Sequence, residues 1–131
     1  MIIRSPVSPL NKALYDRLRG ALSSPTYDYV PDGKKPPYTV LADTEAQMWS
    51  SKTMPGADVL ASIVIISTYQ GDKEVAEIAD VAISAVTSSP LIMADDWKIT
   101  STTVIKHTVN RLETYRQAII QFGFKICDVR K

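Results

Sequence analysis

Residues Asp58 to Tyr69 form the segment that most restricts how this chain folds. Aliphatic side chains recur through it with a period of two, as in a β-strand. Both sides of the strand are apolar, which predicts a central strand that is covered on each face and has a neighbour at each edge. One side carries Val59, Ala61, Ile63, Ile65 and Tyr69, and the other carries Leu60, Val64 and Ile66.

Four more segments are predicted to form β-strands beside the central strand. Trp97 to Val109 and Tyr115 to Ile126 are rich in β-branched and aromatic residues, and they predict a long C-terminal hairpin. Two shorter strands are expected at Tyr27 to Val30 and Tyr38 to Ala42. The turn residues Pro31-Asp32-Gly33 lie between them, since proline presets φ and glycine accepts a positive φ.

Two amphipathic helices complete the predicted elements. Residues 9–22 carry apolar residues at helical spacing after Ser8, which is expected to act as the N-cap. A second helix is expected to begin after Asp72 and to end before Ser88. The predicted order is α-β-β-β-α-β-β, an α+β fold with two helices, a mostly antiparallel sheet and a long C-terminal hairpin. All 131 residues are expected to form a single domain, 1–131.

Residues 43–57 show no sustained period, and they predict an extended loop. Loops of this length in compact domains are usually functional or disordered. Tryptophan and methionine are enriched in the buried cores of protein interfaces, so a partner or assembly contact is one interpretation. A loop folded back over the core is the other. The candidate contact residues are Asp43, Glu45, Gln47, Met48, Trp49, Lys52 and Met54.

The tip of the C-terminal hairpin is a second candidate contact. It carries three basic or titratable side chains beside one acid, and it is expected either to face a partner, to remain solvated or to touch phosphates. Its residues are Lys106, His107, Arg111 and Glu113.

The sequence offers no set of residues for catalysis. Cys127 and His107 are the only cysteine and histidine, which is too few for a zinc site, and the five glycines form no phosphate-binding loop. Asp95-Asp96 is expected to be a solvated turn. We therefore expect no catalytic residue, no metal and no cofactor.

Charge and hydropathy narrow the class of partner. Fifteen basic and fourteen acidic residues leave no basic excess of the kind that nucleic-acid binders show. No apolar stretch is long enough to cross a bilayer, so no membrane partner is expected. The start of the chain is too short and too broken by Arg4 and Pro6 for a signal peptide. The protein is therefore expected to act where it is made, or to leave the cell only as part of something larger.

The order of these pieces resembles the tail completion proteins of long-tailed (siphovirus-type) bacteriophages, which are also called head-to-tail joining proteins or tail terminators. The resemblance runs from about residue 10 to the C-terminal hairpin. It departs from the family at the hairpin turn, Val109 to Glu113, which lacks the more polar, glycine-containing turn of many members. The segments that carry it are Leu14 to Leu18, Val30 to Gly33, Pro37 to Leu41, the polar stretch with Trp49, Ser67 to Gly71 and Lys73 to Asp80.

The resemblance implies a structural virion protein without enzymatic activity. It implies a homo-oligomeric ring, usually a hexamer, which is assembled in the host cytoplasm at the head–tail interface. The implied partners are the tail tube protein and a head-side stopper or connector protein, with DNA passing non-specifically through the lumen. Residues 43–58 have a net charge of −2. If they line the lumen, their mild repulsion of DNA would favour sliding. A related neck or minor tail component, and a small ligand-binding or enzymatic module, remain alternatives.

Overall fold

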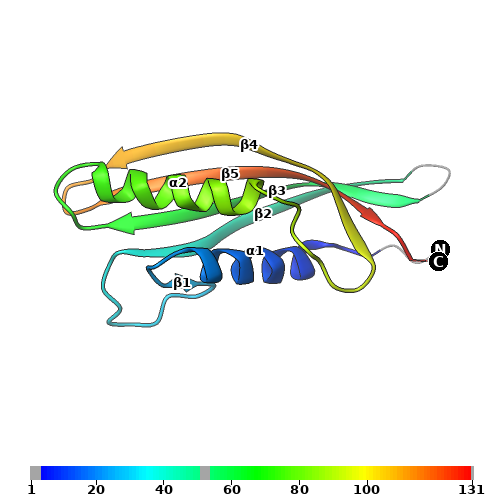
Figure 1. Cartoon of the computed structure of the whole chain (residues 1–131), viewed down its shortest axis with the longest axis horizontal. Helices are drawn as coiled ribbons and strands as arrows, with labels where there is room; N and C mark the ends of the chain where they lie inside the picture. The colour runs from blue at the N-terminus through cyan, green and yellow to red at the C-terminus, as the bar shows by residue number, and fades with distance from the viewer. Residues whose placement is uncertain (1–3, 51–53, 131) are drawn as a thin grey trace.

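A computed structural model, which describes residues 4–50 and 54–130, has the predicted order of elements (Figure 1). The prediction of an α+β fold with two helices and a mostly antiparallel sheet is confirmed. The elements are α1 (Val7–Ala21), β1 (Thr26–Tyr27), β2 (Tyr38–Ser50), β3 (Pro55–Ser67), α2 (Lys73–Thr87), β4 (Trp97–Arg111) and β5 (Arg116–Asp128).

The five strands form one sheet with the order β1-β2-β3-β5-β4. β1 pairs with β2 in parallel over two residues, and the other neighbouring pairs are antiparallel. β3 therefore lies in the middle of the sheet, as its apolar pattern predicts. Twelve of its thirteen residues pair with β5, from Gly56 opposite Cys127 to Ser67 opposite Arg116.

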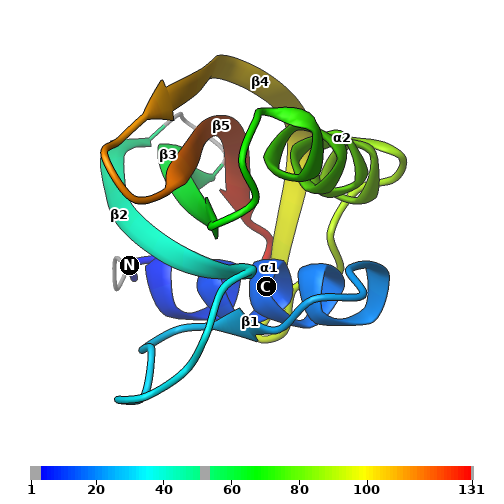
Figure 2. The ribbon, with the colours of Figure 1, turned by 90° about the vertical axis from the view of Figure 1, so that its left-hand side faces the viewer.

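Both helices pack on the same face of the sheet, and they contact each other there (Figure 2). Leu10, Leu14 and Leu18 of α1 are buried, and so are Val75 and Val86 of α2. The buried side chains of β3 and β5 point into the same core: Val59, Ala61, Ile63 and Ile65 from β3, and Ala118, Ile120, Phe122, Phe124 and Ile126 from β5.

The second face of the sheet is open, which corrects the expectation that β3 is covered on both sides. Leu60, Val64 and Ile66 point to this face and are only half-buried. Neighbouring β5 residues on the same face, Ile119 and Gln121, are half-buried as well. Among residues 4–50 and 54–130, the apolar side chains of this face are partly shielded by one another and not by a further layer.

The predicted loop at residues 43–57 is wrong. β2 continues to Ser50 and β3 begins at Pro55, so most of the predicted loop is a two-stranded ladder. A β-bulge between Leu41 and Thr44 interrupts the alternation of buried and exposed residues, and this hides the strand period in the sequence. The sequence pattern also misses this strand because the distal part of β2 is exposed and carries polar residues on both faces.

Local sequence signals correctly predict that the two helices exist, but they predict the start of α1 less accurately. α1 begins at Val7, before Ser8, and its N-cap residue is Pro6, so the predicted Ser8 cap is wrong. The Ser5 hydroxyl instead accepts a hydrogen bond from the Val7 amide at 3.3 Å. The turn at Pro31-Asp32-Gly33 is confirmed, because Gly33 has φ +81° and the Lys34 amide donates to the Pro31 carbonyl.

Gly56 provides a test of the β2–β3 ladder. A Cβ atom at this position would overlap the indole ring of Trp49 and lie 2.7 Å from the Ile126 carbonyl oxygen. Gly56→Ala is therefore expected to lower the free energy of unfolding by about 1–3 kcal/mol through overpacking. Urea denaturation followed by circular dichroism measures the change.

Gly20 supplies the matched control for that measurement. It lies in α1, and a Cβ atom there would meet nothing within 4 Å. Gly20→Ala should raise the free energy of unfolding by about 0.5–1 kcal/mol, because alanine loses less conformational entropy in a helix. Equal stability of the two variants would contradict the packing of Trp49 on Gly56.

Candidate assembly surfaces

Trp49 is held against its own hairpin. It lies opposite Gly56 in the ladder, and its indole Nε1 donates a hydrogen bond to Asp58 Oδ1 at 3.2 Å. Met48 points to the other face, opposite the buried Ala57, and 41% of its surface is exposed. Met48, rather than Trp49, is therefore the apolar side chain that this end of the hairpin offers to a partner.

The polar candidates of this segment lie along the outer edge of β2. Asp43 occupies the bulge after Leu41, and it is exposed. Glu45 and Gln47 are exposed as well. Met54 directly precedes β3 and is half-buried, whereas Lys52 lies outside the described residues. These side chains form a strand edge and not the irregular loop expected from the sequence.

Two of the four hairpin-tip candidates do not lie at the tip. β4 continues to Arg111, so Lys106 and His107 are within the strand. Lys106 pairs with Gln121 on the open face, and His107 pairs with Ile120 on the helix-covered face. Only Arg111 and Glu113 lie at the turn, and the sequence prediction is corrected accordingly.

A carboxylate holds this turn against the start of α2. Asp72 accepts a hydrogen bond from Arg111 Nη2 at 3.0 Å, and Arg116 Nε lies 3.3 Å from its other oxygen. The hydrogen bond from Arg111 lowers the pKa of Asp72, and the charges of Arg111 and Arg116 act in the same direction. Asp72 is thus engaged with β4 and β5, and it forms no side-chain cap on α2.

The two hairpin ends lie at opposite ends of the sheet (Figure 1). The β2–β3 end adjoins Cys127, near the start of β4, and the β4–β5 turn adjoins Ser67. β3 has 13 residues, and at about 3.3 Å per residue it separates the two ends by roughly 40 Å. One sheet therefore carries two distant and chemically different contact regions.

A second charged cluster fixes the N-terminal segment at the β2–β3 end. Asp128 is 3% exposed and accepts hydrogen bonds from Arg4 Nη2 at 2.9 Å and from Arg130 Nε at 3.0 Å. The Arg4 guanidinium also lies 4.4 Å from the centre of the Trp97 ring. Hydrogen bonds from Arg4 hold the pKa of Asp128 far below its usual value of 3.8, although desolvation opposes this shift.

The described residues contain no cluster of three or more histidine, cysteine or acidic side chains that would hold a metal ion. His107, Asp95 and Asp96 are exposed, and Cys127 is half-buried. None of the helices in the described part of the chain is long and apolar enough to cross a membrane. What the described residues do offer is surfaces for contact at the two ends of the sheet.

Comparison with known proteins identifies the family. The family model described as tail completion protein gp17 matches residues 12–126. The chain belongs to the tail completion protein gp17 family. Members of this family are structural components of the virion and not enzymes, which confirms the structural role implied by the resemblance. The partners of this chain are accordingly other virion proteins.

Solved structures share the fold. A chain in the virion of a native gene transfer agent particle has a TM-score of 0.83 at 19% identity, covering 95% of this chain and 99% of that chain. The gp17 protein of bacteriophage SPP1 has a TM-score of 0.56 at 18% identity, covering 95% of this chain and 93% of that chain. No curated protein sequence matches this chain.

Sequence reasoning missed both charged clusters. Arg4 and Asp128 are 124 residues apart, and Asp72 and Arg111 are 39 apart. No spacing rule connects charges at such separations. One signal was available. Every second residue of β5 is buried, and Asp128 falls on one of these positions, where an acidic side chain needs a cationic partner.

The Asp128 cluster predicts an acid-dependent part of the stability. Asp128→Asn is expected to lower the free energy of unfolding by about 2 kcal/mol at pH 7, because Arg4 and Arg130 lose a desolvated partner. The folded-state pKa is depressed, so this contribution is complete above the ordinary value of 3.8 and is lost as the pH falls toward the folded-state pKa. Urea denaturation between pH 3 and pH 8 measures it.

Asp16 is the control for this experiment. Its ion pair with Lys12 is exposed at the surface of α1. Asp16→Asn should change the free energy of unfolding by less than about 0.5 kcal/mol, as is usual for surface pairs. If both variants lost the same stability, or if the Asp128 effect did not shrink at acid pH, the assignment of the buried cluster would be wrong.

Proposed function

We propose that six copies of this chain form a ring through which DNA passes. The ring caps the tail tube and joins it to the head-side stopper or connector. The observation that carries the proposal is the placement of two different contact regions at opposite ends of one sheet. A joining protein needs this arrangement because its two partners approach from opposite directions.

The two ends differ in chemistry, which suits them to different partners. The β2–β3 end presents Met48 and Gln47 from one edge strand. The β4–β5 end presents Glu113 and the Asp72–Arg111 ion pair. The exposed Met48 at one end and the charged side chains of the turn at the other give each partner a different recognition surface.

The charge of the chain is compatible with DNA passage. Its 15 basic and 14 acidic residues nearly cancel. A surface that neutralised many phosphates would bind DNA and slow its exit, because affinity for DNA rises with the number of cation–phosphate contacts. A ring built from copies of a chain without a basic excess therefore supports sliding of DNA and not its retention.

A particle-forming strain lacking this gene tests the two-ended role. Met48→Lys at one end and Glu113→Lys at the other should each lower the yield of joined particles by about tenfold or more, the effect of losing roughly 1.4 kcal/mol of contact free energy. The two variants should arrest assembly differently, one leaving tails without a cap and the other leaving capped tails unattached to filled heads. Electron microscopy distinguishes these products.

Glu77→Gln is the control, since Glu77 is an exposed residue of α2 and is not one of the contact residues proposed at either end. It should support the yield of the wild-type chain. Normal yield from both end variants, or one identical arrested product from both, would contradict a joining protein with two separate ends.

A further inference from the structure

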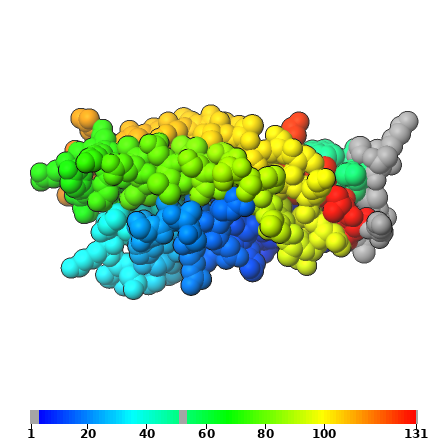
Figure 3. Space-filling view, viewed as in Figure 1, coloured from blue at the N-terminus to red at the C-terminus, as the bar shows by residue number. Residues whose placement is uncertain are grey.

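Two long edges of the sheet have no hydrogen-bonding neighbour among the described residues. β4 is the last strand in the sheet order, and β1 covers β2 only opposite Thr39 and Val40. Residues 41–50 of β2 and the outer side of β4 therefore present unpaired N–H and C=O groups, which are a template for a further strand. Figure 3 shows β4, in yellow and orange, along the upper margin of the molecule.

The two edges carry opposite charge. β4 contains Lys98, Lys106 and Arg111 and no acidic residue, whereas β2 contains Asp43 and Glu45 and no basic residue. All five side chains are exposed. Opposite charges on neighbouring strands stabilise pairing and like charges oppose it. Each edge is therefore suited to the other and unsuited to a second copy of itself.

The strand directions allow one copy to continue the sheet of the next. Because β2–β3, β3–β5 and β5–β4 are all antiparallel, β4 runs opposite to β2. β4 of one copy laid beside β2 of another therefore makes an antiparallel pair, with the helix-covered faces on the same side. Such a contact joins two different surfaces, and it generates a ring when its rotation closes.

The register brings the opposite charges together. Lys106 pairs with Gln121 of β5, and Gln121 pairs with Ser62 of β3. Ser62 is level with the bulge of β2 that holds Asp43. A neighbour added without displacement along the strands therefore places its Lys106 beside Asp43.

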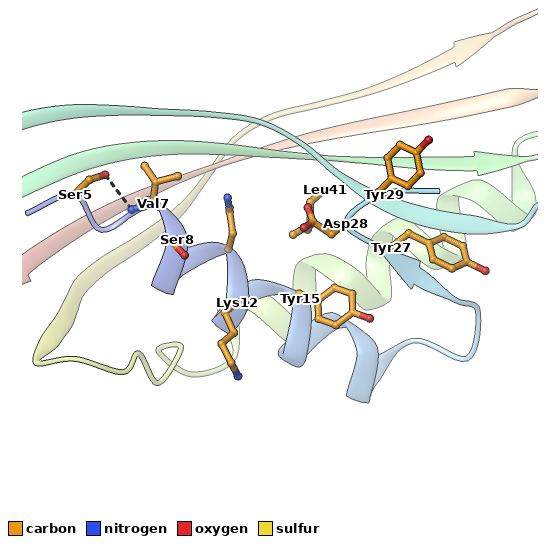
Figure 4. A pocket seen from close by; sticks show the side chains of 10 residues that line it. Ser5, Val7, Ser8, Lys12, Tyr15, Tyr27, Asp28, Tyr29 and Leu41 are labelled. Carbon is orange, nitrogen blue, oxygen red and sulfur yellow. Dashed lines mark hydrogen bonds between the residues drawn. The ribbon is translucent and has the colours of Figure 1, made fainter. Parts of the chain in front are cut away.

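A hollow lies beside the unpaired part of β2, between the sheet and α1 (Figure 4). Its volume is about 820 Å³. α1 contributes Tyr15 to one wall, and Tyr27, Tyr29 and Leu41 line the other. Tyr29, at the rim of the hollow, is 81% exposed, so the described part of the chain leaves most of its aromatic surface uncovered.

β4 carries side chains at the right level to enter this hollow in a neighbouring copy. Val104 pairs with Phe122 and His107 pairs with Ile120, which places both on the helix-covered side. Val104 is nevertheless 39% exposed. Through the ladder, His107 is level with Leu41 at the wall of the hollow.

From these features we infer that copies of this chain join head to tail by sheet extension. β4 of one copy pairs with residues 41–50 of β2 in the next, Lys106 lies beside Asp43, and Val104 and His107 cover the hollow. The inference rests on the proposed ring and names the contact that closes it. A second copy of this chain pairs with each edge, because the two edges carry opposite charge, run antiparallel and bring Lys106 into register with Asp43.

Charge reversal in the strain lacking this gene tests the inference. Asp43→Lys and Lys106→Glu should each lower the yield of joined particles by about tenfold or more, because each places like charges across the interface. The double variant should restore the yield. The two single variants expressed together should also restore it, since copies that alternate around an even-numbered ring make only opposite-charge contacts.

Two controls keep the outcome interpretable. Glu77→Lys reverses an exposed charge on α2 and should leave the yield unchanged, and circular dichroism should show that every variant is folded. In a Cys127→Ser background, the Asp43→Cys, Lys106→Cys chain should give a ladder of oxidised oligomers during assembly. Glu77→Cys, Lys106→Cys should give none.

The possible failures are distinguishable. If the strain without the gene still yields joined particles, the proposed function is wrong. If the gene is required but the single reversals have no effect, or their loss is not restored by either combination, the edge-to-edge contact is overturned and the joining role stands.

Discussion

The pairing of β3 with β5 determines where the other helices and strands of this fold lie. The two strands share twelve residue pairs, and the helix-covered side of both is buried along this ladder. Val59, Ile63, Ile120 and Phe122 provide the apolar floor on which α1 and α2 pack. Because burial of these side chains is the dominant favourable term in folding, the helices and the outer strands take their positions from this pair.

Long outer strands follow from that central pair. β2 and β4 each extend along nearly its full length, and they end the sheet with little cover at either edge. An isolated soluble domain usually shortens or blocks such edges, since they promote association. Here the edges are long and oppositely charged, as the proposed contact between copies of this chain requires.

Charged clusters hold the two ends of the sheet without forming a site for chemistry. Asp72 joins the β4–β5 turn to the start of α2 through Arg111 and Arg116, and Asp128 holds Arg4 at the other end. Each carboxylate has a lowered pKa because arginines surround it. Perturbed acids often mark active sites, but these two are engaged by structural partners. They stabilise the ends that the proposed function uses.

Much of the fold was predictable because its strongest signals are local. The apolar period of Asp58 to Tyr69 identified the central strand, and the helical stripe of Val75, Ala79, Ala82 and Val86 identified α2. The order of elements followed from these. The loop at residues 43–57 was wrongly predicted, because the bulge at Asp43 and the polar exposure of distal β2 remove the period that reveals a strand.

Apolar period and turn residues act between near neighbours in the chain, so they predict the element order, the α+β class and the family resemblance without the structure. Three features follow from the folded arrangement alone: which side of the sheet stays open, where Trp49 packs and which charges meet. These depend on contacts between segments that are far apart, such as Arg4 with Asp128. The sheet order also sets Asp43 and Lys106 on opposite edges, and no local rule relates residues across four strands.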